Sequence, residues 1–298
     1  MKTMLLFLLA FTLRIQPAVA IITDEVDRGI GLFHAQQYEA SKALLEKALD
    51  TTEMKKDATI HYYLCRIHFA VDSYDRAIEH CKVAVQLRGN QAEYHFWLGR
   101  SYGAEAATAD VLRQALLAPK IRKAFERTIV LDPTHIQGRV GLINFYLRAP
   151  AMMGGSLEKA YDHVRLLMDL DDCEGRLLLA RFYEKTDQYE AAEATYQALH
   201  HQYGATEEPY DLYKQYGYFL LRQKRYAHAI DVFMAQVHRF PARAAAYEQL
   251  GDGYSASRRW QEAVEIYRHA LHLDPAATSA REKLHTAEKA WLKVLGSR

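Results

Sequence analysis

The sequence has few cysteines and prolines, almost no net charge, and no long apolar run beyond its first residues. Three cysteines in 298 residues exclude a small scaffold that depends on many disulfides for its stability. Lysine and arginine number 38 against 37 acidic residues, so the chain as a whole has no attraction for nucleic acid or acidic membranes. After residue 20 no stretch has the roughly 20 apolar residues that a membrane-spanning helix needs.

The first 20 residues have the composition of an export signal. Lys2 provides a basic start, residues 5–13 (LLFLLAFTL) form an apolar core, and residues 18–20 (AVA) are small, as at a cleavage site. Because Cys65 is the first cysteine, no thiol near residue 20 can carry a lipid anchor. We therefore expect a cleavable signal peptide over 1–20 and a periplasmic or secreted chain over 21–298. That chain has 36 basic and 37 acidic residues and no stable membrane insertion.

The sequence also lacks the common motifs of catalysis and cofactor binding. Neither Gly-x-Ser-x-Gly nor His-Glu-x-x-His occurs. Gly154-Gly155-Ser156 is followed by Leu-Glu-Lys rather than by the Gly-Lys-Ser/Thr ending of a phosphate-binding loop. The chain is therefore predicted to be no enzyme and to hold no cofactor.

One pattern of aromatic and small residues recurs along the chain. Its clearest copy consists of Tyr247, Leu250, Gly251, Tyr254, Trp260, Ala263, Tyr267, Ala270 and Pro275. Apolar residues three and four positions apart predict amphipathic helices, and small residues allow two such helices to approach closely. The pattern resembles the tetratricopeptide repeat, a helix-turn-helix unit of about 34 residues.

The resemblance covers nearly all of the chain after the signal peptide. It implies an all-α fold, a right-handed superhelical solenoid, because one helix pair cannot bury its apolar face without stacked neighbours. A C-terminal capping helix is predicted over 279–295, where Leu284, Ala287, Trp291 and Leu295 recur at helical spacing among charged residues. The seven predicted units are 22–55, 58–91, 92–135, 136–172, 173–206, 210–243 and 244–277.

Two units depart from the repeat pattern by insertion. In 92–135 the pattern of the second helix resumes only at about Ile121, and about ten extra residues fall within 103–119. We expect this inserted segment to lengthen the helices or add a small one. In 136–172 about five extra residues include Pro150-Ala-Met-Met-Gly-Gly-Ser156, which resembles a turn in a bacterial subset of tetratricopeptide proteins. In this turn Pro150 ends one helix, the glycines relax the backbone, and Ser156 caps the next helix.

A cluster of histidine and cysteine in the second unit leaves three interpretations open. His61, Cys65 and His68 share one helix face, and Cys81 lies on the partner helix. Two histidines and two cysteines suit a tetrahedral zinc ion, which would make the chain a metal-binding protein or an enzyme. The same positions also suit ordinary interior contacts, or a Cys65–Cys81 disulfide in an oxidising compartment.

The first helix of each repeat is implied by the resemblance to line a concave groove. The positions that face such a groove predict an apolar and aromatic row beside a column of arginine and asparagine, a combination that suits a peptide with acidic groups or a free carboxylate. The residues assigned to this groove are Tyr62, Arg66, Phe96, Arg100, Asn144, Arg181 and Tyr218.

The leading hypothesis is a non-catalytic, exported scaffold that binds another protein or peptide in this groove. Envelope assembly and secretion are the expected settings. A subunit that self-associates by end-to-end stacking is a further alternative. The identity of the partner does not follow from the sequence, because repeats dictate the interior of the stack and leave recognition to surface residues.

Overall fold

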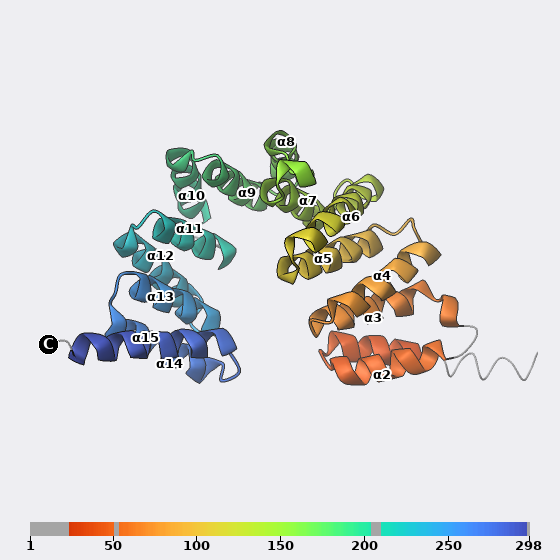
Figure 1. The fold of residues 1–298 in the computed structure, drawn as a ribbon, viewed down its shortest axis with the longest axis horizontal. Coiled ribbons are helices and arrows are strands. Elements are labelled where there is room, and N and C mark those ends of the chain that lie inside the picture. The colour runs from red at the N-terminus through yellow and green to blue at the C-terminus, as the bar shows by residue number, and fades with distance from the viewer. Residues whose placement is uncertain (1–23, 51–53, 204–209, 297–298) are drawn as a thin grey trace, which may run out of the picture. The chain divides into compact units, whose positions relative to one another are not determined.

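The computed structural model describes residues 24–50, 54–203 and 210–296, and in these ranges the chain is helical with short connections (Figure 1). The predicted signal peptide lies outside the described residues. The chain divides into two compact units, an N-terminal unit over Met1–Asp172 and a C-terminal unit over Cys173–Arg298. Among the described residues, none of the helices combines the length and the apolar character needed to cross a bilayer.

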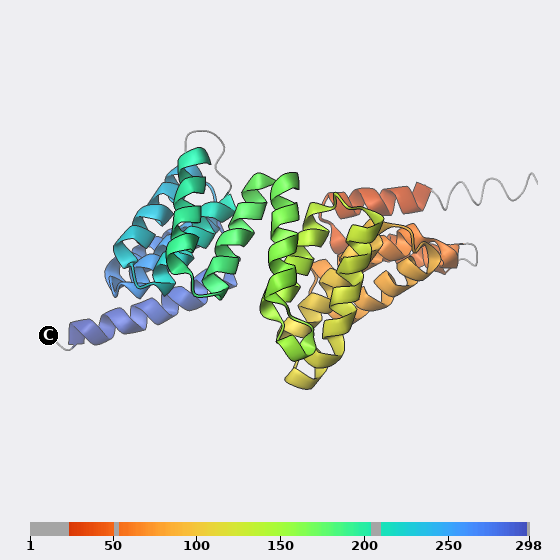
Figure 2. The same ribbon diagram turned by 90° about the horizontal axis from the view of Figure 1, so that it is seen from above.

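The N-terminal unit consists of antiparallel helix pairs, and neighbouring helices lie side by side in both views (Figure 1, Figure 2). A helix over 24–34 pairs with α2. The elements that follow are α2 (Tyr38–Leu49), the short 3-10 helix η1 (Met54–Lys56), α3 (Ala58–Ala70), α4 (Tyr74–Leu87), α5 (Ala92–Thr108), α6 (Val111–Leu131), α7 (Ile136–Arg148), the 3-10 helix η2 (Ala151–Met153) and α8 (Leu157–Leu170).

The C-terminal unit continues with the same kind of helix pairs. Its helices are α9 (Asp172–Lys185), which starts at the boundary between the units, α10 (Tyr189–Tyr203), α11 (Tyr210–Arg222), α12 (Tyr226–Arg239), α13 (Ala244–Ala256), α14 (Trp260–Leu273) and α15 (Thr278–Gly296). Helix α15 packs on α14 through Ala287, Leu284 and Trp291. The predicted all-α fold of stacked helix-turn-helix units is confirmed.

The small residues of the repeat act at the close approach of paired helices. A Cβ atom on Gly217 would lie 2.3 Å from the ring of Phe233, and a Cβ atom on Gly251 would lie 2.5 Å from the ring of Tyr267. Both rings are buried, so any side chain at either glycine would push the helices apart. The sequence pattern therefore records a packing requirement.

The turns inside the regular repeats share one backbone feature. A non-glycine residue with positive φ lies two positions before the aromatic residue that opens the second helix: Gln36, Asp72, Asp187, Lys224 and Arg258. The left-handed conformation reverses the chain within a short link. The two repeats with insertions, 92–135 and 136–172, have no non-glycine residue with positive φ among their described residues. The second of these repeats has Gly154 at φ 96° instead.

The insertion at 103–119 lengthens both helices of its pair. Helix α5 runs for 17 residues and α6 for 21, with Pro119 inside α6. The pattern alone placed the start of the second helix near Ile121. The structure starts it ten residues earlier, at Val111, where Asp110 caps the helix by accepting a 2.8 Å hydrogen bond from the Arg113 amide.

Candidate functional site

Two arginines and three aromatic rings from the helix over 24–34, α3 and α5 alternate along one surface of the N-terminal unit. The Arg66 guanidinium lies 4.5 Å from the centroid of Phe33 and 4.9 Å from that of Trp97. The Arg100 guanidinium lies 4.5 Å from the same Trp97 ring and 4.6 Å from Phe69. We call this series Phe33, Arg66, Trp97, Arg100 and Phe69 the arginine ladder.

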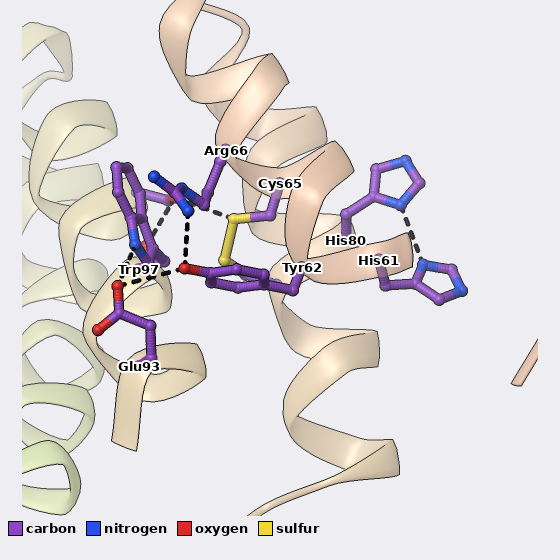
Figure 3. The surroundings of a disulfide bond; sticks show 9 residues. His61, Tyr62, Cys65, Arg66, His80, Glu93 and Trp97 are labelled. Atoms are coloured by element: carbon purple, nitrogen blue, oxygen red, sulfur yellow. Dashed lines mark hydrogen bonds between the residues drawn. A yellow bond between two sulfur atoms is a disulfide. The ribbon is translucent and has the colours of Figure 1, made fainter. Parts of the chain in front are cut away.

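Glu93 fixes the central ring of the ladder. Its Oε1 accepts a 2.8 Å hydrogen bond from Trp97 Nε1 and a 3.2 Å hydrogen bond from the Tyr62 hydroxyl (Figure 3). Its other oxygen, Oε2, lies 3.0 Å from His135 Nε2. Tyr62 also accepts a 2.9 Å hydrogen bond from Arg66. Burial, followed by the charge of Glu93, raises the pKa of the Tyr62 hydroxyl, so it remains a neutral donor to the carboxylate.

The two arginines form a like-charge pair on one indole ring. Arg100 is exposed and makes no hydrogen bond or ion pair with any residue in the described part of the chain. Although the residue as a whole is exposed, the rings of Phe69 and Trp97 partly desolvate its guanidinium group, and this desolvation, followed by the charge of Arg66, lowers the pKa of Arg100. An arginine nevertheless remains protonated. The Arg66 Nε is buried and has no hydrogen-bond partner there. An anion placed beside the two guanidinium groups would therefore relieve their mutual repulsion.

The aromatic row of the predicted groove differs from the expectation. Tyr62 and Phe96 are 9% and 7% exposed, because Tyr62 stacks on Tyr94 and Phe96 packs against Phe125 and His135. These two rings form the floor beneath the arginines. The aromatic ring between the two arginines is instead Trp97, which is half-buried and lies four residues after Glu93 and three before Arg100, a helical spacing from which the sequence could have indicated it.

The remaining predicted groove residues fall into two groups. Asn144 lies half-buried on α7 and, with Arg100, lines a cavity of the N-terminal unit. Arg181 on α9 and Tyr218 on α11 belong to the C-terminal unit, and both are half-buried. The Tyr218 hydroxyl donates a 2.6 Å hydrogen bond to Asp252.

Asp252 and Glu248 belong to an internal network of the C-terminal unit. Asp252 accepts a 2.7 Å hydrogen bond from Tyr267 and pairs with Lys283 at 2.8 Å. Glu248 pairs with the same lysine at 2.6 Å. Burial first, and then the charge of Asp252, raises the pKa of the Tyr218 hydroxyl. Tyr218 is thus a component of the α11, α13 and α15 packing.

The histidine and cysteine cluster forms a disulfide. Cys65 and Cys81, both fully buried, join α3 to α4 (Figure 3). Both sulfur atoms are therefore bonded to each other and are not available as thiolate ligands, which removes two of the four ligands of the alternative metal site. In addition, the described residues contain no group of three or more histidine, cysteine or acidic side chains suited to a metal ion.

A third histidine, which the sequence had not singled out, completes the cluster around this disulfide. His61 Nε2 lies 3.3 Å from the Lys55 carbonyl oxygen, so this nitrogen carries the proton and donates. The Nδ1 of neutral His61 is then the acceptor for His80 Nδ1–H, at 3.0 Å (Figure 3). His68 stacks on His80 with ring centroids 5.4 Å apart. The three rings pack together as neutral groups.

Acidification is expected to destabilise the N-terminal unit through these histidines. Burial, and then His61 and His68, lowers the pKa of His80 from 6.5 to about 4; burial also lowers the pKa values of His61 and His68. Unfolding thus takes up protons, so stability is complete above pH 6.5 and falls between pH 6.5 and about 4. The His80 shift corresponds to about 3 kcal/mol, which we reduce to about 2 kcal/mol because the ring is partly exposed. The charged groups that act on the cluster are Glu39, Lys42, Glu46, Asp57, Arg76 and Glu79.

Urea unfolding of the wild type and of His80→Phe, followed by circular dichroism across this pH range, measures the effect. Phenylalanine keeps a ring in the stack and does not titrate. We expect the slope of unfolding free energy against pH to be shallower in the variant. Equal slopes would show that His80 does not carry the pH dependence.

Comparisons with known proteins agree with the fold. Residues 246–280 match the tetratricopeptide repeat family model, and no curated protein sequence matches the chain significantly.

Among solved structures, a tetratricopeptide repeat protein from Parabacteroides merdae superposes with a TM-score of 0.63 at 12% identity, over 90% of this chain and 98% of its own. A thermophilic protein with this repeat from Thermus thermophilus gives a TM-score of 0.51 at 22% identity, over 67% of this chain and 99% of its own. The Cut9–Hcn1 hetero-tetramer structure gives 0.54 at 12% identity, over 87% of this chain and 48% of the matched chain. The fold of this chain is therefore that of tetratricopeptide repeat proteins.

Proposed function

We propose that this chain is an exported, non-catalytic scaffold that binds a segment of another protein on the arginine ladder of its N-terminal unit. The fold suggests an interaction scaffold, since stacked repeats create extended binding surfaces. The partner presents a carboxylate, from an acidic side chain or from its C-terminus, to Arg66 and Arg100. Envelope assembly or secretion is the proposed setting.

The observation that carries this proposal is that neither Arg66 nor Arg100 forms an ion pair with an acidic residue in the described part of the chain. Glu93, the carboxylate that contacts Trp97 of the ladder, already accepts hydrogen bonds from Tyr62 and Trp97. Stacking on aromatic rings holds both guanidinium planes in place before a partner arrives. A carboxylate bound there would form charge-assisted hydrogen bonds without the loss of a competing ion pair.

Two features support export. The apolar and basic composition of residues 1–20 is typical of a signal peptide. The Cys65–Cys81 disulfide fits an oxidising compartment, because thiols are kept reduced in the cytosol.

Charge reversal tests the ladder. Affinity capture from envelope extracts of the source cells is expected to recover partners with the wild type and at least tenfold less of them with Arg66→Glu plus Arg100→Glu, because a carboxylate then meets two like charges. The matched control is Arg88→Glu plus Arg127→Glu, which changes the same charge at exposed positions outside the ladder. Circular dichroism shows that each variant is folded. Identical partner lists for the wild type and the ladder variant would overturn the assignment.

A further inference from the structure

A cavity of about 630 Å³ lies in the N-terminal unit beside the arginine ladder. Helices α5, α6 and α7 and the turn that follows α7 line it, together with Phe69 at the end of α3. Its volume is in the range of about 300–1,000 Å³ that is typical of ligand pockets. Neither the repeat pattern nor the comparisons assign it a role.

Both segments that break the repeat pattern meet at this cavity. The insertion at 103–119 contributes a series of small residues, among them Gly103 and Ala107, and the enlarged turn contributes Pro150 and Met153. Small side chains on the lengthened α5 and α6 leave space that larger ones would fill. The repeat stack does not require these additions, so the cavity is a feature of this chain rather than of the repeat.

The turn forms a defined wall. Ser156 N donates a 3.1 Å hydrogen bond to the Tyr146 carbonyl oxygen, and Gly155 N donates one of 3.1 Å to that of Pro150. Ser156 also caps α8 by accepting a 3.3 Å hydrogen bond from the Lys159 amide. The two methionines of the turn separate: Met152 is 92% exposed, and Met153 lines the cavity. A methionine side chain adapts its shape to an apolar guest.

The charges at the cavity indicate the chemistry of its ligand. Phe125, Phe145 and Met153 make its walls apolar, whereas Arg100 and Arg148 place two cations beside them. Arg148, like Arg100, is exposed and forms no hydrogen bond or ion pair within the described ranges. Arginines without acidic partners next to an apolar hollow are complementary to a group that is apolar at one end and anionic at the other.

The geometry points to this cavity as the anchor site for a protein segment that carries a large apolar side chain next to an acidic residue. This inference rests on the proposed function and names the class of its partner. Arg100 belongs both to the cavity and to the ladder, so a segment that inserts its apolar side chain between α5 and α7 continues along Arg100 toward Arg66. One bound protein segment would thus contact both the cavity and the arginine ladder. A small ligand confined to the cavity would contact only the cavity.

Gly103 allows the cavity to be filled without disturbing the fold. A Cβ atom at Gly103 meets nothing within 4 Å, and leucine is a stronger helix former than glycine. Gly103→Leu is therefore expected to fold normally and to occupy the hollow. The matched control is Gly31→Leu, at an exposed helical glycine whose Cβ also meets open space, far along the chain from the cavity.

Selection of short random peptides displayed on phage against the wild-type protein supplies the probe. We expect the enriched sequences to share a large apolar residue next to aspartate or glutamate. Fluorescence anisotropy of one such synthetic peptide should then show at least tenfold weaker binding to Gly103→Leu and to Arg148→Glu, and unchanged binding to Gly31→Leu. Arg148→Glu tests the site without filling it.

Three results would overturn the inference. If the peptides bind Gly103→Leu as well as the wild type but do not bind Arg66→Glu plus Arg100→Glu, the arginine ladder is the binding site and the cavity is not part of it. Peptides without an acidic residue would remove the role of the arginines. Binding of decanoate at the cavity, blocked by Gly103→Leu, with no peptide enriched, would assign the cavity to a small amphiphile.

Discussion

Loss of the Cys65–Cys81 disulfide is expected to lower the free energy of unfolding of the N-terminal unit by about 3 kcal/mol. The bond joins residues 16 positions apart, and a cross-link over a loop of about this length stabilises mainly by restricting the unfolded chain. Both cysteines are fully buried, and Cys65 Sγ lies 3.8 Å from Ser101 Oγ of α5. The cross-link therefore lies at the place where α3 supports the helix that carries Trp97 and Arg100.

Urea unfolding under oxidising and reducing conditions measures this contribution. Dithiothreitol should lower the unfolding midpoint of the wild type, and Cys65→Ala plus Cys81→Ala should have a low midpoint in both conditions. The reductant-insensitive double variant is the control for any effect of dithiothreitol elsewhere in the chain. A wild-type midpoint that does not change on reduction would contradict the prediction.

The fold could be predicted because its rules are local. Helix pairs follow from the spacing of aromatic and small residues within each repeat, and the structure shows the contact behind that spacing at Gly217 and Gly251. The insertion at 103–119 follows no repeat rule. Its two lengthened helices depend on caps such as Asp110 and on packing that tolerates Pro119 inside α6, neither of which the repeat pattern encodes.

The candidate site could be predicted only in part. Helical spacing assigned Arg66 and Arg100 to one surface, and the structure brings them to the same indole ring. Spacing could not reveal that Tyr62 is buried, because its burial depends on Tyr94 of the next repeat. Nor could it choose between a metal site and a disulfide, since that choice depends on the distance between two helices.

The cavity illustrates the same limit in another form. Its lining comes from four helices and a turn between residues 69 and 153. Arg100 and Asn144 were assigned to a groove from the sequence, but most of the other lining residues are small or apolar, so the sequence did not mark them as residues of a site. The useful signal is that two insertions interrupt a regular repeat. Interruptions are where a repeat protein adds surface beyond what its stack requires.

The last prediction concerns Gly155, in the turn that forms one wall of the cavity. A Cβ atom on Gly155 would lie 1.8 Å from the Ala149 carbonyl oxygen and 2.7 Å from its carbon. Because the obstacle is backbone, no side-chain rotation can relieve it, and the turn must open. We expect Gly155→Ala to lower the free energy of unfolding by about 3 kcal/mol, in the range of severe steric changes.

Opening the turn is also expected to break the hydrogen bonds that hold the turn against the cavity. The hydrogen bonds from Gly155 N to the Pro150 oxygen and from Ser156 N to the Tyr146 oxygen span the turn, so displacing Gly155 moves Met153 away from the cavity. Gly155→Ala should therefore bind the selected peptide more weakly even at temperatures where it is folded. Gly31→Ala is the matched control, since its Cβ meets open space in a helix outside the cavity lining, and it should stabilise the unit by about 0.5–1 kcal/mol. Thermal melts that place Gly155→Ala at the wild-type midpoint would show that the turn is not the rigid wall that the cavity requires.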